Sequence, residues 1–174
     1  MSEIDLTGLD ELFAYKNRLM NDLLTNEEIV RLLDDDCRIV QDPKKFVYTQ
    51  VFPFEFTPTV TEHGKTIICC EVDIREVISK TVLAPVIYIW EFTHISKLRL
   101  PGGEGVRVDK LASEIVKGLS GSRYYGHGEL ELQAVKRFSP IKDYQGKVIT
   151  FITKDWNRPY NSVQQVVPGN RREW

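Results

Sequence analysis

Apolar residues recur at helical spacing near the start of the chain, over residues 6–24, mostly as leucines. The next segment, "TNEE", places Thr25 three residues before Glu28, a spacing that fits a capping box at the start of a second helix. That helix carries the apolar run "IVRLL", and the polar stretch "DDDCRIVQDP" ends it. The pattern therefore predicts a helical region over residues 1–40.

The spacing changes after this region. Residues 46–56, "FVYTQVFPFEF", are aromatic and β-branched, but Pro53 cannot donate to a strand ladder, so we expect an edge strand or a bulge. Residues 66–77 alternate between apolar and charged positions, as a half-buried strand does, and a turn is placed before them at residues 63–64. Residues 84–92, "APVIYIWEF", are apolar on both faces. This indicates a central strand or one sandwiched in an assembly.

One further helix and two more strands follow. Asp109 can cap a helix with an apolar stripe, which Gly118 or Gly121 ends. Residues 129–138 and 147–153 are predicted strands, with a turn at "DYQGK" between them.

This order of elements predicts an α+β domain on a mostly antiparallel sheet of about five strands. An N-terminal helical region precedes the sheet, and one helix lies between strands three and four. We expect a single domain over residues 1–157, with the helical region at 1–40 and the sheet and helix at 46–157. Residues 158–174 are polar with two prolines, which indicates an extended C-terminal arm or a disordered tail.

Composition narrows the classes of partner. A hydrophobic fraction of 42% and a charged fraction of 28% are ordinary for a globular domain of 174 residues. The net charge of −2 gives no general attraction to nucleic acid or to an anionic membrane. No apolar run reaches membrane-helix length, and the acidic N-terminus lacks the features of a signal peptide. Three cysteines, an odd number, argue against a disulfide framework and for a reducing compartment.

The stretch "LRLPGGEGVRVDKLASEI", residues 98–115, has the glycines of a phosphate-binding loop. Such a loop also needs a Lys-Ser/Thr pair after its last glycine, because the lysine reaches the phosphates and the hydroxyl holds magnesium. Here Gly105 is followed by "VRV", and the dinucleotide-binding pattern is missing too. We predict a crossover loop that binds no nucleotide.

The remaining candidates for chemistry are weak. Ser120 lacks the glycine spacing of a nucleophile elbow, and the histidines form no triad that sequence can establish. Cys69 and Cys70 are adjacent in a strand, so they face opposite sides and cannot jointly bind one metal. The acidic run at residues 34–36 indicates a solvated loop, with a divalent cation or a basic partner as alternatives. We expect no enzyme, no catalytic residue, no metal and no cofactor.

Aromatic residues instead point to assembly. The segment "SRYYGHG" joins an arginine to two tyrosines, as protein interfaces often do, with a stacking platform for single-stranded nucleic acid as the alternative. The aromatic residues of the arm have no core of their own to enter, so a neighbouring subunit is their natural host.

From "YIWEFTH" onward, the chain resembles the tail-terminator or head–tail joining (neck) proteins of long-tailed bacteriophages. The shared features are a central strand, a long loop, a helix that starts "R-x-D-x-L", a glycine-rich loop, a strand "LELxxVxRFSP", a turn "YQG" and a last strand that ends in "D-x-N". The resemblance covers residues 83–157. The matching residues are Arg107, Asp109, Leu111, Leu130, Leu132, Val135, Arg137, Phe138, Ser139, Pro140, Tyr144, Gln145, Gly146, Asp155 and Asn157.

The resemblance implies a viral structural protein, made in the host cytoplasm and located in the virion. Six copies would form a ring on the last tail-tube ring, stop its polymerisation and offer the other face to a neck or head-completion protein. DNA would pass through the lumen without specific binding, and no membrane is involved. The long helical region and the polar arm depart from compact family members, so another neck component, such as a head-completion stopper or adaptor, stays open. A small metal-dependent hydrolase and a single-strand-binding module are more distant alternatives. The candidate assembly-interface residues are Arg107, Arg123, Tyr124, Tyr125, Trp156, Tyr160 and Trp174.

Overall fold

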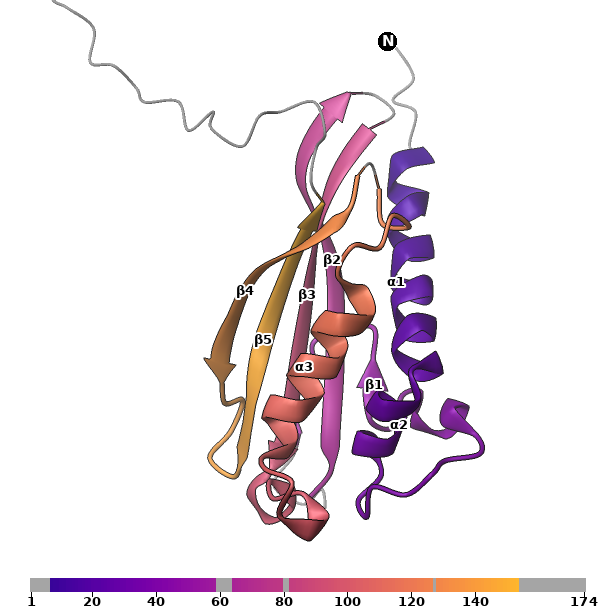
Figure 1. The fold of residues 1–174 in the computed structure, drawn as a ribbon. Coiled ribbons are helices and arrows are strands. Elements are labelled where there is room, and N and C mark those ends of the chain that lie inside the picture. Colours follow the sequence, from indigo (N-terminus) through magenta and orange to yellow (C-terminus); the bar gives the residue numbers. More distant parts are fainter. Residues whose placement is uncertain (1–6, 59–63, 80–81, 127, 154–174) are drawn as a thin grey trace, which may run out of the picture.

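Five strands form one sheet in the order β1-β2-β3-β5-β4 (Figure 1). The computed structural model describes residues 7–58, 64–79, 82–126 and 128–153. In it, β1 runs parallel to β2, and every other neighbouring pair is antiparallel. The strands are β1 (Val51–Phe52), β2 (Thr66–Ser79), β3 (Val82–His94), β4 (Leu130–Phe138) and β5 (Tyr144–Thr153).

Three α-helices lie on one face of this sheet, with α1 and α3 running along the strands (Figure 1). They are α1 (Thr7–Thr25), α2 (Glu27–Leu33) and α3 (Arg107–Leu119). Short 3-10 helices span Pro43–Phe46, Ile95–Lys97 and Pro101–Gly103. The predicted α+β class is confirmed, with a helical region before the sheet and one helix between the third and fourth strands.

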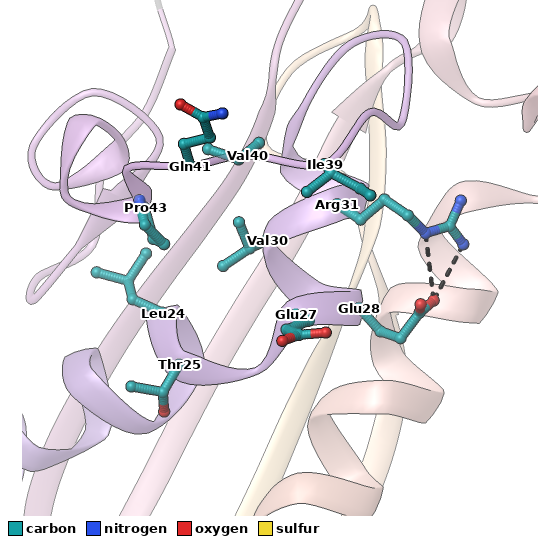
Figure 2. Close-up of a pocket in the computed structure, with 10 residues that line it drawn as sticks. All are labelled: Leu24, Thr25, Glu27, Glu28, Val30, Arg31, Ile39, Val40, Gln41 and Pro43. Atoms are coloured by element: carbon teal, nitrogen blue, oxygen red, sulfur yellow. Dashed lines mark hydrogen bonds and ion pairs between the residues drawn. The ribbon is translucent and has the colours of Figure 1, made fainter.

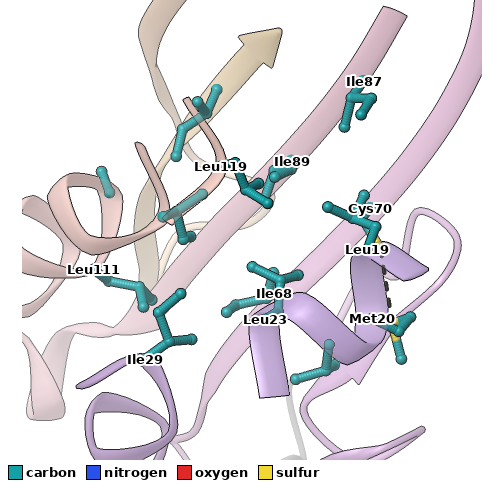
Figure 3. Close-up of a cluster of buried hydrophobic side chains, with 14 of the residues drawn as sticks. Leu19, Met20, Leu23, Ile29, Ile68, Cys70, Ile87, Ile89, Leu111 and Leu119 are labelled. Atoms are coloured by element: carbon teal, nitrogen blue, oxygen red, sulfur yellow. Dashed lines mark hydrogen bonds between the residues drawn. The ribbon is translucent and has the colours of Figure 1, made fainter. Parts of the chain in front are cut away.

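The main core lies between the helices and the sheet (Figure 3). Alternate residues of the strands point into it, and burial of each large side chain contributes roughly 1.5–3 kcal/mol. Residues 68, 70 and 72 of β2 share this face, as the alternation predicts. The fully buried members drawn include Leu19, Leu23, Ile68, Cys70, Ile87, Ile89 and Leu111.

A smaller cluster lies on the other face of the sheet, around Ile67, Cys69 and Phe92, with Phe52 stacked on Phe56 at 4.2 Å between ring centroids. β3, the middle strand of the five, therefore supplies side chains to clusters on both faces of the sheet. The two adjacent cysteines enter opposite clusters, as expected for neighbours in a strand.

Two helix starts differ from the prediction. Asn26 rather than Thr25 caps α2, because its side-chain oxygen accepts hydrogen bonds from the amides of Glu28 and Ile29, while Thr25 still belongs to α1. In α3 the cap position is Val106, and Asp109 lies in the first turn, where its carboxylate binds Lys147 at 2.5 Å. A carboxylate in the first turn still stabilises the helix, because it interacts favourably with the positive end of the helix dipole.

Strand ends also differ from the prediction, most of all at the first and last strands. The predicted strand at 46–56 is reduced to Val51–Phe52, which pairs at the edge of the sheet, since the chain before it forms a 3-10 helix. The predicted turn at "DYQGK" is wrong, because β5 begins at Tyr144 and already includes Gly146. Of the turn expected at residues 63–64, His63 lies outside the described residues, as does the whole predicted arm.

Gly146 is required by close packing rather than by a turn. A Cβ at this position would overlap the carbonyl oxygen of Glu91 and lie 2.5 Å from the Cα of Phe92. These are backbone atoms of the paired central strand, so they cannot move aside without breaking the ladder.

We therefore expect Gly146→Ala to lower the free energy of unfolding by about 3 kcal/mol, near the upper end for overpacked sites. Urea denaturation would measure the loss. Gln145→Ala, at the exposed neighbouring position, is the matched control and should change stability little. Equal stability of the two variants would contradict this account of the glycine.

Candidate assembly groove

A groove of about 590 Å³ lies where α1 ends, between α2 and the segment of residues 39–43 (Figure 2). Its centre is apolar, with Leu24, Val30 and Pro43 converging there (Figure 2). Val30 is buried, whereas Ile39 on the rim has 93% of its surface exposed. An isoleucine this exposed beside an apolar groove is typical of a surface that binds a partner.

Acidic side chains border the apolar centre. Glu27 and Glu28 occupy the first turn of α2, where negative charge is favourable. Arg31 binds Glu28 at 3.0 Å, so its positive charge is already partly neutralised. No described cation pairs with Glu27. The groove therefore presents apolar surface with a slight excess of negative charge.

The acidic run at residues 34–36 builds the loop that carries Ile39. The carboxylate of Asp34 accepts hydrogen bonds from the backbone amides of Asp36 and Arg38, both at 3.2 Å. Arg38 in turn pairs with Asp36, and Cys37 adopts a positive φ of 53°. Among the described residues, no group of three or more His, Cys, Asp or Glu side chains is placed to hold a metal ion. In this structure the run stabilises a tight turn.

Arg107, from the first turn of α3, anchors the same loop from inside. Only 1% of its surface is exposed. Its guanidinium donates to the backbone carbonyl oxygens of Lys97 (2.9 Å), Leu32 (2.5 Å), Asp34 (2.8 Å) and Asp35 (2.9 Å). These include the carbonyls at the end of α2, where a cation is favoured by the helix dipole. The expectation that the Arg107 side chain contacts another subunit is wrong, because this side chain is buried inside its own subunit.

The other predicted interface residues divide into surface and core. Tyr124 is 67% exposed with Arg18 over its ring, and the exposed Arg123 binds Glu129. Tyr125 is fully buried and donates a hydrogen bond to Asp22 at 2.6 Å. Burial, followed by that hydrogen bond, raises the pKa of Tyr125 far above its ordinary value. Tyr125 is thus a core residue, which corrects its assignment to an interface.

The three aromatic residues of the arm, Trp156, Tyr160 and Trp174, lie outside the described residues.

The glycine-rich loop reverses the chain between β3 and α3. Gly102, Gly103 and Gly105 have φ angles of 74°, 80° and 109°, which other residues rarely adopt. The amide of Leu100 binds the carbonyl of Gly105 at 3.0 Å, and the amide of Arg107 binds the carbonyl of Leu98 at 2.7 Å. The loop therefore delivers Arg107 to the end of α2, and its glycines serve this turn.

The model of the YomW family matches residues 26–153, that is 128 of the 174 residues. The chain belongs to the YomW family. This is a family derived from Bacillus phage, so the chain is a phage-related protein. No curated protein and no solved structure matches it.

In this YomW family member, the matched region begins after α1 and ends with β5, so it includes α2, the loop of residues 34–43 and Arg107. No described helix has both the length and the apolar character needed to cross a membrane.

Glu91 is a buried acid that the sequence analysis did not select as a candidate residue. Its position as the charged residue of the apolar run "APVIYIWEF" could have indicated it. It is fully buried, and neither carboxylate oxygen makes a hydrogen bond to a described residue. Burial raises the pKa of the Glu91 carboxyl well above its ordinary value. The charge and nearby amide of Lys147 oppose this rise, whereas Asp109 adds to it. The folded YomW protein therefore favours the neutral acid here.

Replacing Arg107 with alanine should lower the free energy of unfolding by about 3 kcal/mol or more, because several buried carbonyls lose their donor. Denaturant unfolding would measure this, and amide hydrogen exchange should rise specifically in residues 34–41. Arg99→Ala removes an exposed arginine from the same region and is the control. Unchanged exchange in the loop would show that the guanidinium does not position the groove.

Glu91 should make stability depend on pH. Above its ordinary pKa of 4.5 the unfolded chain loses the proton while the folded chain keeps it, so the free energy of unfolding falls as pH rises toward the folded-state pKa. Glu91→Gln stays neutral, so its stability relative to the parent should increase above pH 4.5, by up to about 1.4 kcal/mol per pH unit. Unfolding curves from pH 4 to 8 would measure this. The exposed carboxylate control, Glu104→Gln, should show no such trend.

Proposed function

We propose that this phage-related protein is a structural, non-enzymatic component of the virion, the tail terminator. In this role it forms a ring on the last tail-tube ring and joins the tail to the neck. The family match supports a phage role in general, and the resemblance over residues 83–157 supports this specific one. The observation that carries the proposal is the exposed Ile39 beside an apolar groove, because a partner that covers this surface would remove apolar area from water.

The sheet offers a second surface for assembly at β4. This strand is an edge of the sheet, and no described strand pairs with its outer side. Leu132 and Val135 are each 42% exposed along it. A bulge between Leu132 and Ala134, together with the exposed Lys136 and Arg137, interrupts the edge. Such features limit uncontrolled pairing, so a specific neighbour rather than an open-ended fibre fits this edge.

These two surfaces lie on opposite sides of the subunit. The β4 edge ends the sheet on one side, and the groove lies beyond α2 toward the β1 side (Figure 1). Contacts between unlike surfaces repeat head to tail, and they close into a ring when the rotation between subunits closes. A ring of six follows from the resemblance. Its faces would contact the tail-tube protein and a neck protein, and DNA would pass through the lumen.

We expect the purified protein to form closed rings, of six subunits, at high concentration or on tail tubes. Light scattering would give the mass and negative-stain images the symmetry. Val135→Asp should weaken the ring by about tenfold or more, since a charge in a buried contact costs more than about 1.4 kcal/mol. Phe13→Asp, at a 71% exposed position on α1, is the control.

Experiments on purified phage tails distinguish the tail-terminator role from the other neck roles. Tails from a phage lacking this protein should have uncontrolled lengths and no heads, and the protein should be found at the proximal tip of normal tails. Its presence only on heads would instead indicate a head-completion stopper or adaptor. Absence from the virion would overturn the structural role.

A further inference from the structure

The segment that forms the outer wall of the groove has unused backbone groups. Residues 37–40 lie outside the helices and strands, and the backbone of Ile39, Val40 and Gln41 makes no hydrogen bond to another described backbone group. Ile39 projects from this segment almost fully exposed, while Val40 and Pro43 line the groove behind it. Free backbone groups can hydrogen-bond to an extended peptide, as a sheet edge does, while the apolar groove beside them receives its side chains.

The chain itself contains a segment with matching chemistry. Residues 154–174 include the stretch "NSVQQVVPGNRREW", in which three valines stand among polar residues. β-branched residues favour the extended conformation that strand addition requires. The part from 158 to 174 carries three arginines against one glutamate, and the groove carries Glu27 and Glu28 with only Arg31 to offset them. The two are therefore complementary in charge as well as in apolar character.

The position of the segment favours an adjacent copy as its host. The segment follows Thr153, which pairs with Leu130 of β4 at one side of the sheet. The groove lies on the opposite side, next to α1 and α2 (Figure 1). An extended chain spans about 3.3 Å per residue, so the 21 residues 154–174 could reach up to roughly 70 Å. That exceeds the radius of gyration of about 15 Å expected for a domain of this size. In a head-to-tail ring, the side that bears β4 faces the side of the neighbour that bears the groove.

We propose that the groove around Ile39 binds the C-terminal arm, residues 158–174, of an adjacent copy of this chain. The proposal rests on the proposed ring, since the arm meets a neighbouring groove only in an assembly. Arg107 acts on this site indirectly, because it positions the loop that carries Ile39.

Photo-crosslinking of the full-length protein tests this directly. A benzophenone-bearing phenylalanine replaces Ile39, and equal amounts of unlabelled and ¹⁵N-labelled protein are mixed, assembled and irradiated. We expect crosslinked peptides that join the groove to residues 159–171, about half of them pairing a labelled with an unlabelled chain. The matched control carries the same probe at Phe13, which is also exposed and apolar but lies on α1. This probe should not crosslink to the arm.

The mass of the sample, measured before irradiation, separates the two proposals. Rings without crosslinks to the arm would overturn the docking site and leave the ring standing. Crosslinks to the arm only between chains of the same label would show that each arm binds its own groove, which also overturns the proposal. A monomeric sample without such crosslinks, even on tail tubes, would overturn both.

A substitution at Ile39 measures how much this contact contributes to ring assembly. Ile39→Asp should weaken ring assembly by about tenfold or more, because it removes an apolar contact and places a charge where docking would bury it. Melting temperature should be unchanged, since the side chain is exposed in the subunit. An unchanged assembly constant for Ile39→Asp would contradict the proposal.

Discussion

The helical layer of this protein depends on one buried guanidinium. The side chain of Arg107 extends from the first turn of α3. It donates hydrogen bonds to carbonyl oxygens at the end of α2, in the loop after α2 and at Lys97, which follows β3. A buried charge is costly unless hydrogen bonds replace its lost water. Here they do, because four carbonyls, some from a helix terminus, surround the planar donor. The same contacts satisfy acceptors at the end of α2 that no helix residue can reach.

The sheet and the helical layer together determine which apolar surfaces are buried. Its helix-covered face holds the larger core, while the other face holds a smaller aromatic cluster near Phe92 and leaves Tyr88 and Trp90 half-buried. Because β3 is central, it supplies side chains to both clusters, and its Glu91 is fully buried. Apolar surface that the layers do not use then remains at the edges, along β4 and around Ile39.

These edge surfaces are the basis of the proposed assembly. The turn that precedes Ile39 is held by hydrogen bonds, since the Asp34 carboxylate accepts from the amides of Asp36 and Arg38, and Arg107 donates to the carbonyl of Asp34. A preformed surface loses little conformational entropy when a partner binds. A YomW family member built in this way can present an apolar contact without exposing its core, as the proposed assembly requires.

The sequence by itself determined the periodic features of the protein. Helical spacing near the start, alternation in β2 and the two-sided apolar run of β3 depend on neighbours a few residues apart, so they could be read directly. Local rules failed where several residues compete, as Asn26 and Thr25 do for a helix cap, or where a distant strand removes the space for a side chain, as at Gly146. The roles of Arg107 and Tyr125 were decided only by the tertiary structure. Their partners Leu32 and Asp22 lie 75 and 103 residues away, and no pattern along the chain encodes which of its distant groups a buried donor will meet.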